Sequence, residues 1–216
     1  VNALRSLLLG AHAEGIRQVL CVTGDRIPEG QSGYAKPVFN VNSFGLLRMV
    51  REMNETVFPE SPLLPAAAMN PSAANPDAER DRVLRKVEAG ARLFLTQPIF
   101  SDRALPLLRR LKEDFPDIRI LAGVLPLSGR RNALFLQNEV PGIVVPDEVV
   151  ERFAPDLDRD AALETGLDLA MERMASLAGL ADGFYLVPPF NRAGRVVSLL
   201  RRFREGAGGT WRDRTG

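Results

Sequence analysis

The sequence has few of the residues on which disulfide scaffolds, metal sites and base-stacking surfaces depend. It contains one cysteine, Cys21, and one histidine, His12, so it offers neither an internal disulfide nor a Cys/His zinc spacing. Aromatic residues make up 6% of the chain and the formal net charge is +1, values that argue against a nucleic-acid partner. Cys21 lies within the apolar run 19–22, which favours a buried thiol over a reactive one.

Long apolar segments are also missing. No stretch approaches the roughly 18 to 20 apolar residues that cross a bilayer, and residues 1–5 lack a signal-peptide pattern. We therefore expect no membrane partner and a cytoplasmic location. The chain begins without a methionine and within a helical pattern, which indicates a truncated reading frame or a fragment.

Short apolar runs alternate with stretches of helical spacing along the whole chain. The runs predict five buried strands, and each is followed by at least one predicted helix. The predicted strands are 16–22, 63–69, 92–96, 118–124 and 183–187. The predicted helices are 4–13, a helix capped by Asn42 or Ser43, 77–89, 102–113, 132–138, 147–153, 161–177 and 194–203. We expect residues 1–204 to form a single domain, and the Gly-rich, charged residues 205–216 predict a disordered tail.

This alternation predicts an α/β fold with a parallel sheet. Two architectures fit it, an open doubly wound sheet and a (β/α)8 barrel. No G-x-G-x-x-G or Walker-type loop follows any predicted strand, which weakens the dinucleotide and P-loop interpretations. Five βα units are too few to close an eight-stranded barrel, so a barrel would lack its first three units.

Candidate site residues gather where the predicted strands end, because parallel α/β proteins bind ligands there. Thr23, Gly24 and Asp25 follow the first strand, Gln97 the third, and Tyr185 lies in the last. Polar and Gly/Pro residues at these ends suit an amide-rich heterocycle better than a metal. The chain has no G-x-S-x-G elbow that would indicate a hydrolase.

Most of these residues have a structural interpretation beside the functional one. Asp25 is either a turn residue or a carboxylate that tunes a cofactor or holds a substrate amine. The Gln97 side chain either hydrogen-bonds to backbone groups of a loop or hydrogen-bonds to a planar ring. From spacing alone, Lys86 is a solvated helix charge, Asn132 a helix cap and Tyr185 a core residue.

Taken together, the strand-end segments resemble the methylenetetrahydrofolate reductase family. The most specific segment is 85–91 followed by 95–100, which reads RKVEAGA and then LTQPIF. The segment 184–190 is similar to the bifunctional subgroup that carries a homocysteine methyltransferase domain upstream. Resemblance extends from residue 1 to about 204, and it is also carried by segments 9–20 with 23–25, 35–39, 122–127 and 138–143.

The resemblance implies a (β/α)8 flavin barrel of which this chain holds about five units, strands 4 to 8. It implies FAD and NAD(P)H as cofactors and the reduction of 5,10-methylenetetrahydrofolate to 5-methyltetrahydrofolate. By motif, Asp25 corresponds to the acidic residue that stabilises the cationic iminium of the folate. The flavin-binding positions are Thr23, Gly24, Asp25, Glu79 and Lys86, and the substrate-binding positions are Gln97, Asn132, Leu136 and Tyr185.

The chain also departs from the family pattern. The general-acid glutamate of the first strand and the flavin-binding residues of strands two and three have no counterpart here, and Ala66, Ala67 and Ala68 stand where an aromatic residue is common. An incomplete barrel would expose edge backbone and core, which predicts a homo-oligomer or an unstable chain. A non-catalytic half-barrel that serves as a binding or assembly module is therefore the alternative function.

Overall fold

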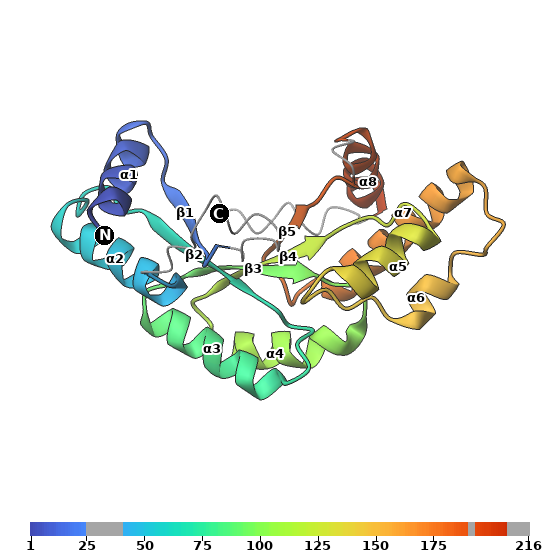
Figure 1. Cartoon of the computed structure of the whole chain (residues 1–216), viewed down its shortest axis with the longest axis horizontal. Coiled ribbons are helices and arrows are strands. Elements are labelled where there is room, and N and C mark those ends of the chain that lie inside the picture. The colour runs from blue at the N-terminus through green and yellow to red at the C-terminus, as the bar shows by residue number, and fades with distance from the viewer. Residues whose placement is uncertain (25–40, 190–192, 207–216) are drawn as a thin grey trace, which may run out of the picture. The chain divides into compact units, whose positions relative to one another are not determined.

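The computed structural model describes residues 1–24, 41–189 and 193–206, and its elements alternate as the sequence predicts. A five-stranded parallel sheet has the order β1-β2-β3-β4-β5, which Figure 1 shows in colours from blue to red. The strands are β1 (Gln18–Cys21), β2 (Leu64–Met69), β3 (Leu93–Pro98), β4 (Arg119–Val124) and β5 (Gly183–Leu186). The α/β class and the parallel sheet are confirmed.

Helices connect successive strands, as a parallel sheet requires. They are α1 (Asn2–Ala13), α2 (Ser43–Thr56), α3 (Pro76–Glu88), α4 (Leu105–Asp114), α5 (Arg130–Glu139), α6 (Asp147–Glu151), α7 (Arg159–Leu177) and α8 (Ala193–Gly206), with the 3-10 turn η1 (Asp102–Ala104) before α4. Residues 205 and 206, predicted to begin a tail, are the last residues of α8, and residues 207–216 lie outside the described part.

The contacts divide the chain into two compact units, which are described separately. Unit 1 comprises residues 1–69, 77–95 and 115–119, and unit 2 comprises residues 70–76, 96–114 and 120–216. Within unit 1, β1 pairs with β2 in parallel, from Gln18 opposite Leu64 to Cys21 opposite Ala67. Within unit 2, β4 pairs with β5 in parallel, from Leu121 opposite Gly183 to Val124 opposite Leu186.

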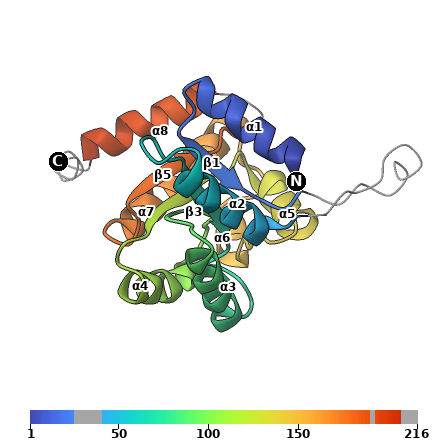
Figure 2. The ribbon, with the colours of Figure 1, turned by 90° about the vertical axis from the view of Figure 1, so that its left-hand side faces the viewer.

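In unit 1, α2 has a side-chain cap at its N-terminus and a buried apolar face. The Asn42 side chain accepts a hydrogen bond from the Gly45 amide at 3.0 Å, so the predicted cap is confirmed. Buried side chains on one face of α2 pack toward the sheet, and these are Leu47, Met49, Val50 and Met53. By contrast, α1 buries none of its residues and is tied to α2 by the Arg5–Glu52 ion pair at 2.8 Å. The two helices lie side by side in both views (Figures 1 and 2).

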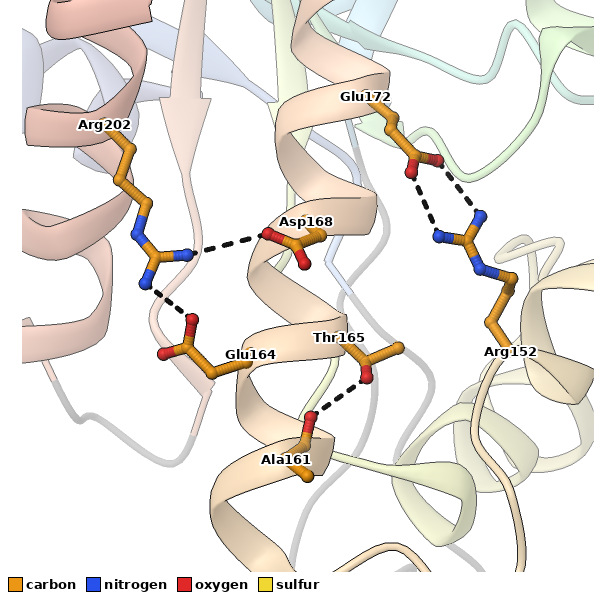
Figure 3. Close-up of polar contacts among 7 residues, drawn as sticks. All are labelled: Arg152, Ala161, Glu164, Thr165, Asp168, Glu172 and Arg202. Atoms are coloured by element: carbon orange, nitrogen blue, oxygen red, sulfur yellow. Dashed lines mark hydrogen bonds and ion pairs between the residues drawn. The ribbon is translucent and has the colours of Figure 1, made fainter.

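In unit 2, the long helix α7 organises the packing. Its buried face meets α8 and the end of β4 in one apolar cluster, formed by Val124, Leu167, Ala170, Met174 and Leu199. Its outer face carries three carboxylates at four-residue spacing. Arg202 of α8 contacts Glu164 and Asp168, and Arg152 makes a two-pronged contact with Glu172 (Figure 3). These exposed pairs orient α7 between its neighbours but add little stability.

The approach of α7 to the chain after β4 is close enough to require a glycine. A Cβ atom at Gly166 would lie 1.8 Å from the carbonyl oxygen of Leu127 and 2.8 Å from its carbonyl carbon. Both contacts are with backbone, which cannot rotate out of the way. This contact therefore fixes where the segment between β4 and α5 leaves the sheet.

Substitution of this glycine tests the contact. We expect Gly166→Ala to lower the free energy of unfolding by about 1–3 kcal/mol, the usual cost of overpacking, and urea denaturation followed by circular dichroism measures it. Gly10→Ala in α1 is the matched control. No atom of the described residues lies within 4 Å of the place that a Cβ would take at Gly10, so alanine there is expected to raise stability by about 0.5–1 kcal/mol. Equal stability of the two variants would contradict the contact.

Candidate functional site

The first predicted site segment lies where β1 ends. Thr23 and Gly24 are exposed, and the Thr23 hydroxyl accepts a hydrogen bond from the Ser43 amide at 3.1 Å. This bond ties the segment after β1 to the start of α2. Asp25, the predicted catalytic carboxylate, lies outside the described residues.

Glu79 and Lys86 come together on the buried face of α3. They are seven residues apart, two helical turns, and only 2% and 8% of their surfaces are exposed. The Lys86 ammonium donates to the Ala68 carbonyl oxygen of β2 at 2.5 Å, and Arg82 forms a close ion pair with Glu79. The sequence alone favoured a solvated charge at Lys86. Its burial corrects that interpretation, and its ammonium lies at Ala68, one residue before the end of β2.

The electrostatic environment of Lys86 is unfavourable to its charge. Burial lowers the pKa of its ammonium, the nearby Glu79 carboxylate opposes that effect, and Arg82 adds to it. Among the described residues, Lys86 has one hydrogen-bond acceptor, so further N–H groups are available for an anion. Hydrogen bonds from an ammonium to a phosphate or carboxylate are stronger than those to a neutral carbonyl, so Lys86 is a candidate ligand for an anion.

In unit 2, Asn132 and Leu136 line a common cavity of about 540 Å³. The Asn132 side-chain oxygen accepts from the Ser128 amide at 3.1 Å. Among the described residues, no acceptor is found for the Asn132 side-chain N–H groups. The sequence pattern favoured a helix cap at Asn132, but α5 begins at Arg130, so Asn132 lies within the first turn. The volume is in the usual range for a small-molecule pocket.

The same cavity contains two residues that sequence reasoning missed. Phe135 and Arg131 also line it, with Ser128 and Gly129, and 56% of the Phe135 surface is exposed. Phe135 follows Asn132 by three residues, so both lie on one face of α5. An exposed aromatic ring beside an amide and a guanidinium suits a flat, polar ring system. The signal that would have found it is the i, i+3 spacing.

The third predicted segment is the end of β3. Gln97 and Pro98 belong to the strand, which extends two residues beyond the predicted end, and the Gln97 side chain is exposed. The Tyr185 hydroxyl forms a short hydrogen bond to the Thr96 carbonyl oxygen. Because burial raises the pKa of the Tyr185 phenol, this hydroxyl stays protonated as a donor. Gln97 and Tyr185 are thus linked through Thr96.

A second cavity of unit 2, about 760 Å³, lies away from these residues. The segments after β3 and β4 and the helices α6 and α7 surround it, and it contains none of the predicted site residues. Ion pairs of Arg173 with Asp102 and of Arg152 with Glu172 lie at its walls, and Figure 3 shows the latter. Arg103, Asp147 and Glu148 line the same cavity and take part in neither of these two pairs.

Metal sites and membrane-spanning helices were considered for the described residues, which are 1–24, 41–189 and 193–206. Within these ranges no cluster of three or more His, Cys, Asp or Glu side chains could hold a metal ion. No helix in the same ranges has the length and apolar content to cross a membrane.

The fold is that of a parallel α/β protein with polar groups at its strand ends. Unit 1 holds the buried ammonium of Lys86, and unit 2 holds the exposed amide of Gln97, the half-buried amide of Asn132 and the exposed ring of Phe135. A model of the methylenetetrahydrofolate reductase family matches residues 1–193, and the chain belongs to this family.

A curated relative supports the same assignment. The chain is 27% identical over 189 residues to 5,10-methylenetetrahydrofolate reductase of Salmonella typhimurium. The alignment covers 84% of this chain and 59% of the relative, so the chain spans about three-fifths of the length of the protein it matches.

The buried charge of Lys86 predicts a specific pH dependence. The pKa of Lys86 is lower in the folded chain than in the unfolded chain, so between the two values the unfolded chain binds more protons. The contribution of Lys86 to the free energy of unfolding therefore rises as the pH increases between these two pKa values. Below this pH window Lys86 is charged in both states, and the full cost of burying its charge destabilises the folded chain. We expect Lys86→Met to gain most stability over the wild type below the window and least above it.

Urea denaturation at a series of alkaline pH values measures this difference. Lys112→Met is the matched control because the Lys112 ammonium lies on the Asp182 carboxylate at 2.8 Å rather than on a backbone carbonyl. A difference between Lys86→Met and wild type that does not change with pH would contradict the buried charge.

Proposed function

We propose that the chain carries the flavin- and folate-binding part of a methylenetetrahydrofolate reductase. The reaction would reduce 5,10-methylenetetrahydrofolate to 5-methyltetrahydrofolate with NAD(P)H as the hydride source. The observation that carries the proposal is the family match, whose span of residues 1–193 includes every predicted site residue. The (β/α)8 barrel, with β1 to β5 as its strands 4 to 8, the cytoplasmic location and the likeness to the bifunctional subgroup belong to the same proposal.

The described residues fit FAD. Buried Lys86 offers N–H donors beside the end of β2, which suits a flavin phosphate, and Glu79 lies on the same face of α3. Thr23 and Gly24 are exposed at the end of β1, and no atom of the described residues lies within 4 Å of a Cβ built at Gly24. FAD, when bound, supplies the hydride chemistry that no side chain provides.

The folate would be held by residues of unit 2. Exposed Gln97 at the end of β3 and the Asn132 amide can each hydrogen-bond a pterin ring, and Phe135 can stack on it. Leu136 closes the apolar side of that cavity. By resemblance, the Asp25 carboxylate stabilises the cationic iminium that forms when the methylene bridge opens.

The alternative function, a non-catalytic binding or assembly module, also has an observation in its favour. Large apolar side chains are exposed on α1, on β1 and beside them. These are Leu7, Leu9, Ile16, Leu20 and Val22. Apolar surface of this extent beside an edge strand is typical of a region that contacts other protein. The same surface supports the proposal of a homo-oligomer.

Flavin titration of the purified chain separates the two functions. We expect FAD to bind with a shifted visible spectrum and Lys86→Met to weaken binding about ten-fold, because it removes a charge-assisted hydrogen bond. Lys112→Met serves as the control and is expected to leave the dissociation constant unchanged. A folded wild-type chain that binds no FAD and does not reduce the folate with NAD(P)H would favour the assembly module.

Light scattering during size-exclusion chromatography tests the association. We expect the mass to rise above the 23.7 kDa of one chain as concentration increases, and Leu20→Lys to shift it back toward that value. Val57→Lys is the control, because Val57 is similarly exposed, at 49%, but lies at the end of α2. A chain that stays monomeric at every concentration would remove the support for the oligomer.

A further inference from the structure

Three residues of neighbouring strands meet at the end of β3, and their contacts are made almost entirely with backbone. Tyr185 of β5 reaches across β4 and donates its hydroxyl proton to the Thr96 carbonyl oxygen of β3. The Thr96 hydroxyl accepts from the Gly123 amide of β4 at 2.9 Å and donates to the Gln97 carbonyl oxygen at 2.7 Å. Thr96 is 2% exposed, so these bonds form away from water.

Gly123 makes the reach of Tyr185 possible. Tyr185 lies opposite Gly123 in the parallel register of β4 and β5. A Cβ atom at Gly123 would lie 2.7 Å from the Tyr185 hydroxyl oxygen, 2.9 Å from the ring carbon that bears it and 3.0 Å from the Thr96 carbonyl oxygen. The tyrosine therefore occupies the space that any side chain at residue 123 would fill.

The consequence falls on Gln97. The carbonyl that precedes it is held by Tyr185, and its own carbonyl is held by the Thr96 hydroxyl. Two residues later, the Ile99 amide donates to the Gly123 carbonyl oxygen at 3.1 Å. Successive side chains in a strand point to opposite faces, so buried Thr96 fixes the backbone while Gln97 remains exposed.

We propose that Tyr185 is a positioning residue, which holds the Gln97 backbone through Thr96 so that the Gln97 amide meets the substrate at a fixed angle. This inference rests on the proposed function, in which Gln97 binds the folate. It changes the role that the resemblance implies for Tyr185, from contact with the substrate to support of the residue that makes that contact. Thr96 and Gly123 complete the support.

The Tyr185→Phe variant removes one hydroxyl and keeps the ring, so it tests the role without disturbing the packing. Nuclear magnetic resonance of the purified chain is expected to show displaced amide signals for Gln97 and Ile99. Ser198→Ala is the matched control, because it removes another hydroxyl-to-carbonyl bond, to Gly194 at 3.2 Å on α8, and should leave those signals in place. Unmoved Gln97 and Ile99 signals in Tyr185→Phe would overturn the positioning role.

A titration with 5-methyltetrahydrofolate gives the functional half of the test. We expect Tyr185→Phe to weaken folate binding about five-fold, the effect of one lost hydrogen bond, with FAD binding unchanged. Gln97→Ala should weaken it more. In the Gln97→Ala background, Tyr185→Phe should have no further effect, because its contribution passes through Gln97.

Two outcomes distinguish the inference from the function on which it rests. If the wild-type chain binds no folate, the proposed function fails and the positioning role fails with it. If the wild type binds folate but the effects of Tyr185→Phe and Gln97→Ala add independently, Tyr185 contacts the ligand directly. In that case the positioning role alone is overturned.

Discussion

Close backbone approach around β4 is the constraint on which the described site depends. Gly123 admits the Tyr185 side chain across the strand, and Gly166 admits α7 against the Leu127 carbonyl a few residues later. A Cβ atom would lie 2.7 Å from the Tyr185 hydroxyl oxygen at residue 123 and 1.8 Å from the Leu127 carbonyl oxygen at residue 166, so a neighbour would have to move in either case. Together the two approaches fix both ends of the short segment that leads from the sheet to α5. The residues that line the Asn132 cavity begin at Ser128, directly after Leu127. The contact of Leu127 with Gly166 therefore restricts the position of this side of the cavity.

Unit 1 contains a buried charge, the Lys86 ammonium, whose hydrogen bond among the described residues goes to a backbone carbonyl and not to a carboxylate. The side chain of Lys86 crosses from α3 to a carbonyl of β2, and Arg82 occupies the carboxylate of Glu79. A lysine that ended on Glu79 alone would be a stable internal ion pair with little affinity for a ligand. Burial of this charge lowers the pKa of Lys86, and perturbed pKa values of this kind are frequent at functional sites.

The sequence predicted the elements well because their signals are local. Asn42 begins α2 as a cap, and α3 ends at Glu88, one residue before its predicted end and two before Gly90 at φ +116°. Buried Cys21 also follows from its apolar neighbours. Prediction of the site was less complete, since its interactions join residues far apart. The Tyr185 hydroxyl meets a carbonyl 89 residues earlier in the chain, and no periodicity reveals such a pair.

The local sequence pattern also gave wrong environments for some residues inside helices. Lys86 falls among charged neighbours of α3, yet its position on the helix turns it inward, and only the neighbouring strand explains why. Asn132 carries the residue type of a cap, but Gly129 stands at that position. Phe135 was not predicted as a site residue, because a single aromatic residue on a helix surface is common. Its meaning comes from the cavity that it shares with Asn132.

The fit of Tyr185 over Gly123 links two positions that are far apart in the gene. A mutation that adds a side chain at 123 removes the space for the tyrosine, and a smaller residue at 185 leaves that space empty. Each change alone is costly, whereas the two made together restore a filled volume. Evolution along this lineage should therefore exchange the two residues as a pair, and descendants that keep the glycine should also keep a ring above it.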